Sequence, residues 1–133
     1  MDEMYKAAMR AQLAEITEEL AEIKTLYQEK GYMPTMAYRA TERNLQLFVA
    51  ACIGITKQTL KSLNKSIPTD TRQSFEKLKA EGQDNSDLPW NKVIGMRNAL
   101  VHDYLNIDRE RIISVIKNDH HLALIQFAKE KIT

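Results

Sequence analysis

The side chains best suited to chemistry lie in one short segment, residues 97–104, which reads RNALVHDY. An imidazole exchanges protons near neutral pH, so His102 is a candidate general acid or base. The guanidinium of Arg97 is a planar fork of donors that matches phosphate oxygens. A single arginine is more often a surface or ion-paired residue, and a single histidine is more often a polar group with its hydrogen bonds satisfied. Residue types alone leave both interpretations open.

A helix through this segment would carry two distinct stripes. Steps of three and four place one arginine on an otherwise apolar stripe of Trp90, Ile94, Arg97, Val101 and Tyr104. A second stripe is polar or small: Asn91, Gly95, Asn98 and His102. Gly95 would let another backbone come close.

Arg97 and His102 are five residues apart, about 140° around an ideal helix, so they converge only if the helix loosens near His102. The step of four from Asn98 to His102 is easier to bridge. We therefore expect either that Asn98 orients the imidazole or that a second chain completes the site.

The segment resembles the R-x4-H-x-Y signature of the HEPN superfamily, and specifically the HepT-like toxins that are paired with minimal nucleotidyltransferase (MNT) antitoxins. Arg97, His102 and Tyr104 match the signature, and the polar Asn98 directly follows the arginine. The placement before the last helix and a length near that of a stand-alone toxin also agree. The resemblance covers the whole chain as an architecture, but only these eight residues are diagnostic.

The resemblance implies a metal-independent endoribonuclease toxin without a cofactor. Arg97 and His102 would be catalytic, with Asn98 supporting them. His102 would move the proton of a ribose 2′-hydroxyl, and Arg97 would stabilise the phosphorane. The family's twofold homodimer would bring a second histidine to the same cleft. The products would be a 2′,3′-cyclic phosphate and a 5′-hydroxyl.

Tyr104 has two interpretations. A tyrosine that ends an apolar stripe is commonly a core or interface residue with its hydroxyl at the rim. In the resembled family, this tyrosine receives AMP from the cognate MNT antitoxin, which would add negative charge and a purine beside Arg97 and His102. A rival class of function is a non-catalytic module that binds nucleotide or RNA and serves as the partner subunit of a nucleotidyltransferase.

The elements around this segment are predicted to be helices throughout. Four glycines and three prolines in 133 residues are too few for a turn-rich β-fold. Hydrophobic spacing predicts a single all-α domain over residues 1–133, an up-and-down bundle of four long helices and one short one. The expected ranges are 2–30, 35–64, 70–82, 90–101 and 108–133. The second range is apolar on more than one side and is expected to be the central helix, and Leu122 is among the residues of the last range that are expected to face inward. Gly31 would cap the first helix, and Asp70 with Gln73 would form a capping box.

The charge is unevenly distributed although the net charge is only +1. Lys57, Lys61 and Lys65 form a basic stripe, which is either a solvated face or a track for RNA phosphates. Arg39, Glu42 and Arg43 are expected to form local ion pairs, or else to place an arginine in the cleft. His120 and His121 receive no role.

Composition and sequence pattern argue against several classes of protein. No apolar run reaches about 18 residues, so no membrane span is expected. The charged start does not resemble a secretory signal, and the single Cys52 allows no internal disulfide and no Cys/His zinc pattern. A cytoplasmic, metal-free protein is expected.

Overall fold

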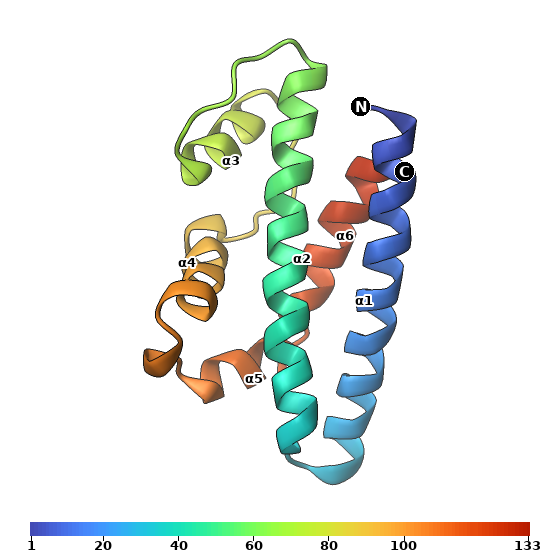
Figure 1. Cartoon of the computed structure of the whole chain (residues 1–133), viewed down its shortest axis with the longest axis vertical. Coiled ribbons are helices and arrows are strands. Elements are labelled where there is room, and N and C mark those ends of the chain that lie inside the picture. The colour runs from blue at the N-terminus through green and yellow to red at the C-terminus, as the bar shows by residue number, and fades with distance from the viewer.

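The computed structural model describes residues 1–133 and is helical throughout, which confirms the predicted all-α class. Two 28-residue helices are joined by four shorter α-helices, and Figure 1 shows the long pair running antiparallel. The elements are α1 (Glu3–Lys30), α2 (Thr35–Ser62), α3 (Thr71–Ala80), α4 (Trp90–His102), the 3-10 helix η1 (Tyr104–Asn106), α5 (Arg109–Lys117) and α6 (His120–Ile132). No helix in the structure combines the length and the hydrophobicity that a membrane-spanning segment requires.

The predicted helix ends are largely where the capping residues placed them. Asp2 accepts a hydrogen bond from the Met4 amide at 2.7 Å and begins α1. Gly31 takes the left-handed conformation, φ 75°, and its amide donates to the Tyr27 carbonyl, as expected for a glycine cap. Asp70 caps α3 through the amides of Arg72 and Gln73, but the return bond from the Gln73 side chain is not formed.

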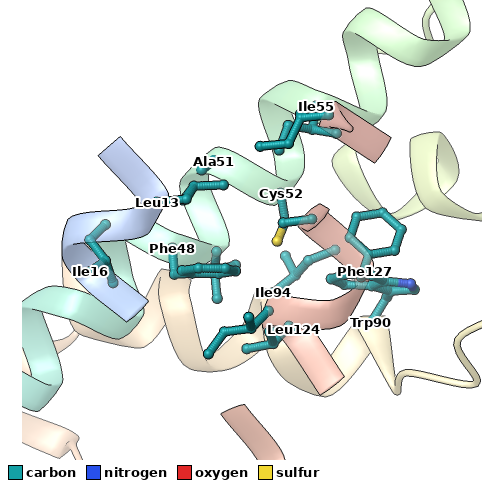
Figure 2. Close-up of a cluster of buried hydrophobic side chains, with 14 of the residues drawn as sticks. Leu13, Ile16, Phe48, Ala51, Cys52, Ile55, Trp90, Ile94, Leu124 and Phe127 are labelled. Carbon is teal, nitrogen blue, oxygen red and sulfur yellow. The ribbon is translucent and has the colours of Figure 1, made fainter. Parts of the chain in front are cut away.

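The central helix is α2, as its apolar residues on several sides indicated. Buried side chains lie around most of its circumference, and every other α-helix packs against it. Figure 2 shows Phe48, Cys52 and Ile55 of α2 among residues of α1, α4 and α6. The ring of Trp90 stacks on Phe75 with centroids 4.0 Å apart, which fixes the start of α4 against α3.

The loop before α4 is organised by one buried carboxylate. Asp84 accepts hydrogen bonds from the Trp90 indole at 2.8 Å, from the Ser86 hydroxyl at 2.5 Å and from the Ser86 amide at 2.9 Å. Burial alone would raise the pKa of Asp84, but these donors outweigh it and hold the pKa below its usual value. The carboxylate therefore ties the loop to the first residue of α4.

The expected single helix over residues 108–133 is wrong, because the chain breaks between α5 and α6. Asp119 adopts a left-handed conformation, φ 59°, and the helix resumes at His120. Asn and Asp tolerate this conformation and are weak helix formers, which explains why the break falls at Asn118 and Asp119. Leu122, expected to point inward, is 53% exposed.

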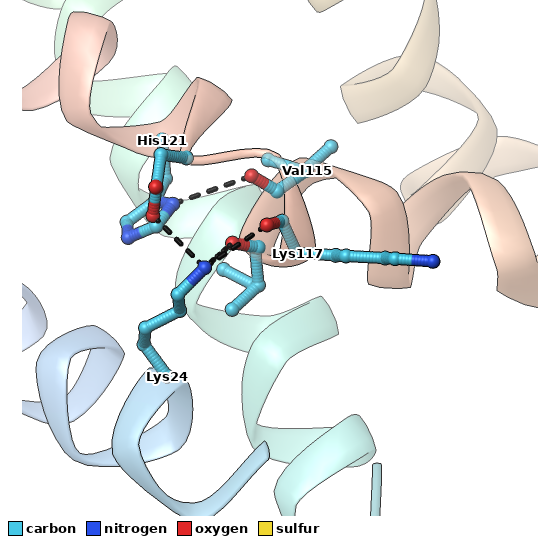
Figure 3. A network of polar contacts seen from close by, with 6 residues as sticks. Lys24, Val115, Lys117 and His121 are labelled. Carbon is cyan, nitrogen blue, oxygen red and sulfur yellow. Dashed lines mark hydrogen bonds and ion pairs between the residues drawn. The ribbon is translucent and has the colours of Figure 1, made fainter. Parts of the chain in front are cut away.

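Lys24 of α1 satisfies the polar groups that the break leaves open. Its ammonium donates to the carbonyls of Ile116 and Lys117 at 3.1 and 2.9 Å and pairs with Asp119 at 3.1 Å. Figure 3 shows this ammonium and the nearby ring of His121, whose Nδ1 lies 3.3 Å from the Val115 carbonyl. The bend allows α6 to pack along α1 and α2.

We expect Asp84→Asn to lower the free energy of unfolding by about 2 kcal/mol, because an amide cannot accept all three hydrogen bonds. The carboxylate's stabilisation is complete above about pH 4 and is lost as the pH falls through the lowered native pKa. Urea unfolding from pH 7 to pH 3 measures both effects. Asp87→Asn, at an exposed neighbouring acid, is the matched control. Equal stability of the two variants would contradict this role of Asp84.

Candidate functional site

The signature segment is held in place by the buried side of α4. Trp90, Ile94 and Leu100 are buried, and they fix how the helix faces the core. The predicted apolar stripe is therefore correct in its first half and wrong in its second. Val101 is 39% exposed, while Tyr104 lies beyond the end of α4 and begins η1.

Arg97 occupies the half-buried side of α4 without a carboxylate partner. Its Nη1 donates to the Oδ1 of the adjacent Asn98 at 3.1 Å, and its buried Nε has no hydrogen-bond partner. None of the four salt bridges includes Arg97. Arg97 is therefore not an ion-paired residue in this structure. A positioned guanidinium that keeps its full charge is suited to binding an anion such as a phosphate.

His102 is the last residue of α4, and its side chain is exposed. The helix stays regular up to this point, with the Asp103 amide bonded to the Ala99 carbonyl, so no loosening brings the imidazole toward Arg97. No hydrogen bond joins Asn98 to His102, although the four-residue spacing allowed one, and the Asn98 Oδ1 accepts a hydrogen bond from Arg97. The chain thus presents the imidazole to solvent rather than to another of its own side chains.

Tyr104 is joined to α2 by a hydrogen bond that spans 62 positions of sequence. Its hydroxyl donates to Oε1 of Glu42 at 2.6 Å. Glu42 is only 8% exposed, whereas Tyr104 is 44% exposed. The bond to Glu42, followed by partial desolvation, raises the pKa of Tyr104 above its usual value.

The surroundings of this bond differ from the expected local ion pairs. Glu42 forms no salt bridge with Arg39 or Arg43, which lie on the same helix. The buried hydroxyl of Tyr38 lies near the same carboxylate without reaching hydrogen-bond geometry, and burial raises the pKa of Tyr38. The guanidinium of Arg109 lies over the Tyr38 ring, 4.4 Å from its centroid.

Gly95 is approached by a side chain rather than by the backbone that its size suggested. The Nη2 of Arg72, from α3, lies 3.8 Å from the position that a Cβ of Gly95 would occupy. A shallow cavity of about 350 Å³ between α3 and α4 contains Arg72, Lys79 and Lys92 in its lining. Arg72 therefore adds a positive charge beside the polar stripe of α4.

The three lysines of the expected basic stripe lie away from the signature segment. Lys57 is fifteen residues beyond Glu42 on α2, which corresponds to about 22 Å along the helix axis. Lys61 lies in the last turn of α2. Lys65 lies past the end of the helix and pairs with Glu81 at 3.6 Å, so the stripe does not continue to it as predicted.

Glu42 and Arg72 are the two residues whose positions the sequence did not reveal. A signal for Glu42 was present, since it interrupts a stripe of buried residues at steps of four, three and four: Tyr38, Glu42, Leu45 and Val49. A single acid on such a stripe indicates a buried carboxylate that needs a partner. No comparable local pattern marks Arg72, because its neighbour Gly95 lies on another helix.

Comparisons with known proteins agree with this architecture. A protein named mRNA nuclease HepT, from Shewanella oneidensis, is 33% identical over 81 residues, which cover 59% of this chain and 59% of that protein. The chain thus spans about three fifths of the length of the curated relative it matches. No solved structure matches the chain. The family model described as ribonuclease HepT-like matches residues 8–130, nearly the whole domain. The chain therefore belongs to the ribonuclease HepT-like family.

Proposed function

We propose that this protein is an endoribonuclease that acts as the toxin of a toxin–antitoxin pair. One observation supports the proposal most strongly. Helix α4 holds Arg97 without a carboxylate partner and ends at the exposed His102. Membership of the ribonuclease HepT-like family and the relative's name, mRNA nuclease HepT, support the choice of RNA as substrate.

The proposed reaction uses the 2′-hydroxyl of the RNA itself as the nucleophile, so it requires no metal ion. His102 accepts the proton of this hydroxyl as the oxygen attacks the adjacent phosphorus. Arg97, held by Asn98, donates hydrogen bonds to the phosphorane oxygens, where negative charge develops. The 5′-oxygen leaves with a proton, and a 2′,3′-cyclic phosphate remains.

A homodimer would supply the proton for the leaving oxygen. The His102 of a single protomer is exposed, and the side-chain hydrogen bond of Arg97 goes to Asn98 rather than to His102. Next to it on the surface, Val101 and Leu105 expose apolar side chains, and Leu105 is 99% exposed. An isologous contact through these residues would bring two signature segments together, so that one His102 acts as base and the other as acid.

RNA outside the cleft would follow basic side chains. Arg72 lies beside Gly95, two turns before His102 on the same stripe of α4, which is about 10 Å along the helix. Lys57 and Lys61 lie farther away, on the last turns of α2, and would contact phosphates of a longer substrate. Lys65 contributes less because Glu81 already pairs with it.

Silencing is proposed to occur by AMPylation of Tyr104 by a cognate MNT nucleotidyltransferase. Tyr104 follows His102 by two residues, and its ring is partly exposed to an approaching partner. An AMP group there would add negative charge and bulk at the mouth of the cleft. The phosphodiester would compete with RNA phosphates for Arg97.

Purified wild-type protein is expected to cleave RNA in the presence of EDTA, and Arg97→Ala and His102→Ala are each expected to slow cleavage at least about 100-fold. Gel assays with radiolabelled RNA measure the rates, and size-exclusion chromatography verifies the oligomeric state. His120→Ala and Arg111→Ala, at exposed positions outside the site, are the matched controls. Wild-type protein that binds RNA and never cuts it would favour the rival, non-catalytic binding module.

Leu105→Glu is expected to weaken the dimer at least about 100-fold and to abolish cleavage, because a carboxylate would be buried in an apolar contact. Analytical ultracentrifugation over a range of concentrations measures the dissociation constant. The control is Leu122→Glu, which changes an exposed leucine on a different helix, α6. A Leu105→Glu variant that remains dimeric would place the subunit contact elsewhere.

Tyr104→Phe is expected to remain toxic in cells that also produce the MNT partner, because the variant has no hydroxyl to accept AMP. Intact mass spectrometry of the co-produced wild-type protein should show about 330 Da added for each AMP unit. The variant should show no added mass. Silencing of the variant by the partner would contradict control by modification.

A further inference from the structure

Glu42 is a buried carboxylate for which the proposed cleavage reaction has no use. It is 8% exposed, forms no salt bridge, and accepts one side-chain hydrogen bond, the 2.6 Å bond from Tyr104. Burying a carboxylate without a cation is unfavourable, and such groups concentrate at functional sites. The Tyr38 hydroxyl lies near the same carboxylate but does not reach hydrogen-bond geometry, so Tyr104 is the group whose proton lies within reach of Glu42.

We propose that Glu42 is the general base that activates Tyr104 for AMPylation. This inference rests on the proposed modification and assigns the residue of this chain that assists it. The Tyr104 oxygen attacks the α-phosphorus of ATP held by the nucleotidyltransferase, and its proton passes to Oε1 of Glu42. The new bond joins the phenolic oxygen to the α-phosphorus, the bond from that phosphorus to the bridging oxygen breaks, and pyrophosphate leaves.

The geometry meets the requirement that a base lies within hydrogen-bond reach of the proton it removes. The donor is the phenolic O–H and the acceptor is a carboxylate oxygen, so no rearrangement is needed before transfer. The same bond raises the pKa of Tyr104, which disfavours a free phenolate. Loss of the proton during the attack, rather than before it, is therefore the favourable route.

The charges around the pair fit the product as well as the reactant. Once Glu42 holds the proton, it is neutral and does not repel the phosphodiester formed on Tyr104. Arg39 and Arg109 are exposed cations close enough to Tyr104 to oppose the rise in its pKa. Both remain available to face the new negative charge.

The alternative is that Glu42 only positions the Tyr104 ring. Glu42→Gln separates the two roles, because the amide oxygen can still accept the hydrogen bond but cannot take the proton. Glu42→Ala removes both functions. A positioning role predicts near-normal modification of the glutamine variant and slow modification of the alanine variant. A base predicts that both variants are slow.

The experiment measures the initial rate at which a cognate MNT nucleotidyltransferase adds AMP to the purified full-length protein. The reaction is run with ATP and followed by intact mass spectrometry. We expect Glu42→Gln and Glu42→Ala each to slow the reaction about 100-fold. The exposed Glu110→Gln is the matched control and should react at the wild-type rate. Circular dichroism and urea unfolding establish that the variants are folded.

The pH dependence supplies a readout that a positioning role would not change. Without the base, the reaction needs the phenolate, so the rate of Glu42→Gln relative to wild type should rise by up to about tenfold per pH unit between pH 7 and 9. This ratio cancels the partner's own pH dependence. A Glu42→Gln rate within twofold of wild type would overturn the inference and assign the base to the partner. Wild-type protein that receives no AMP would instead refute the proposed silencing, and the role of Glu42 with it.

Discussion

The structure depends on the burial of α2 around most of its circumference. Every other α-helix packs against it, so the orientation of each is set by contact with one central rod. Its buried threonines Thr41 and Thr59 donate to carbonyls of α2 itself, but a buried carboxylate needs a donor from elsewhere in the fold. Glu42 finds its partner in Tyr104, which lies beyond the end of α4. The central helix thus organises both the core and the polar contact beside the signature segment.

The position of α4 against this rod determines which signature residues face solvent. Trp90 is fixed by the Phe75 ring and by Asp84, and Ile94 and Leu100 continue the buried side. Arg97 is consequently half-buried and donates a hydrogen bond to the side chain of Asn98, while His102 is exposed in the last turn. The two candidate catalytic groups are therefore presented separately by one protomer, which is the physical reason for proposing a site formed by two.

Much of the fold could be predicted because the relevant signals are local. Asp2, Gly31 and Asp70 mark helix ends through contacts with residues no more than four positions away. The break at Asp119 was missed because the apolar spacing continues across it, and only the weak helix preference of Asn118 and Asp119 indicated a stop. Leu122 was assigned to the core for the same reason, since a continuous helix would have turned it inward.

The candidate site could be predicted in its composition but not in its contacts. The R-x4-H-x-Y spacing identified Arg97, His102 and Tyr104, while the bond between Tyr104 and Glu42 depends on how two helices dock across 62 positions. Arg72 reaches Gly95 for the same kind of reason. Tertiary packing determines which residues of distant helices meet. The hydrophobic pattern of one sequence does not show how two such helices are aligned against each other.

Cleavage is proposed to use the 2′-hydroxyl of the RNA as its nucleophile. The most direct measurement compares an RNA that the protein cuts with the same RNA carrying 2′-deoxyribose at the cut position, in EDTA, and identifies the product ends. The proposed mechanism predicts a 2′,3′-cyclic phosphate and a 5′-hydroxyl from the first substrate and no cleavage of the second at that position. Cleavage of the deoxy-substituted position, or products with a 5′-phosphate, would contradict it.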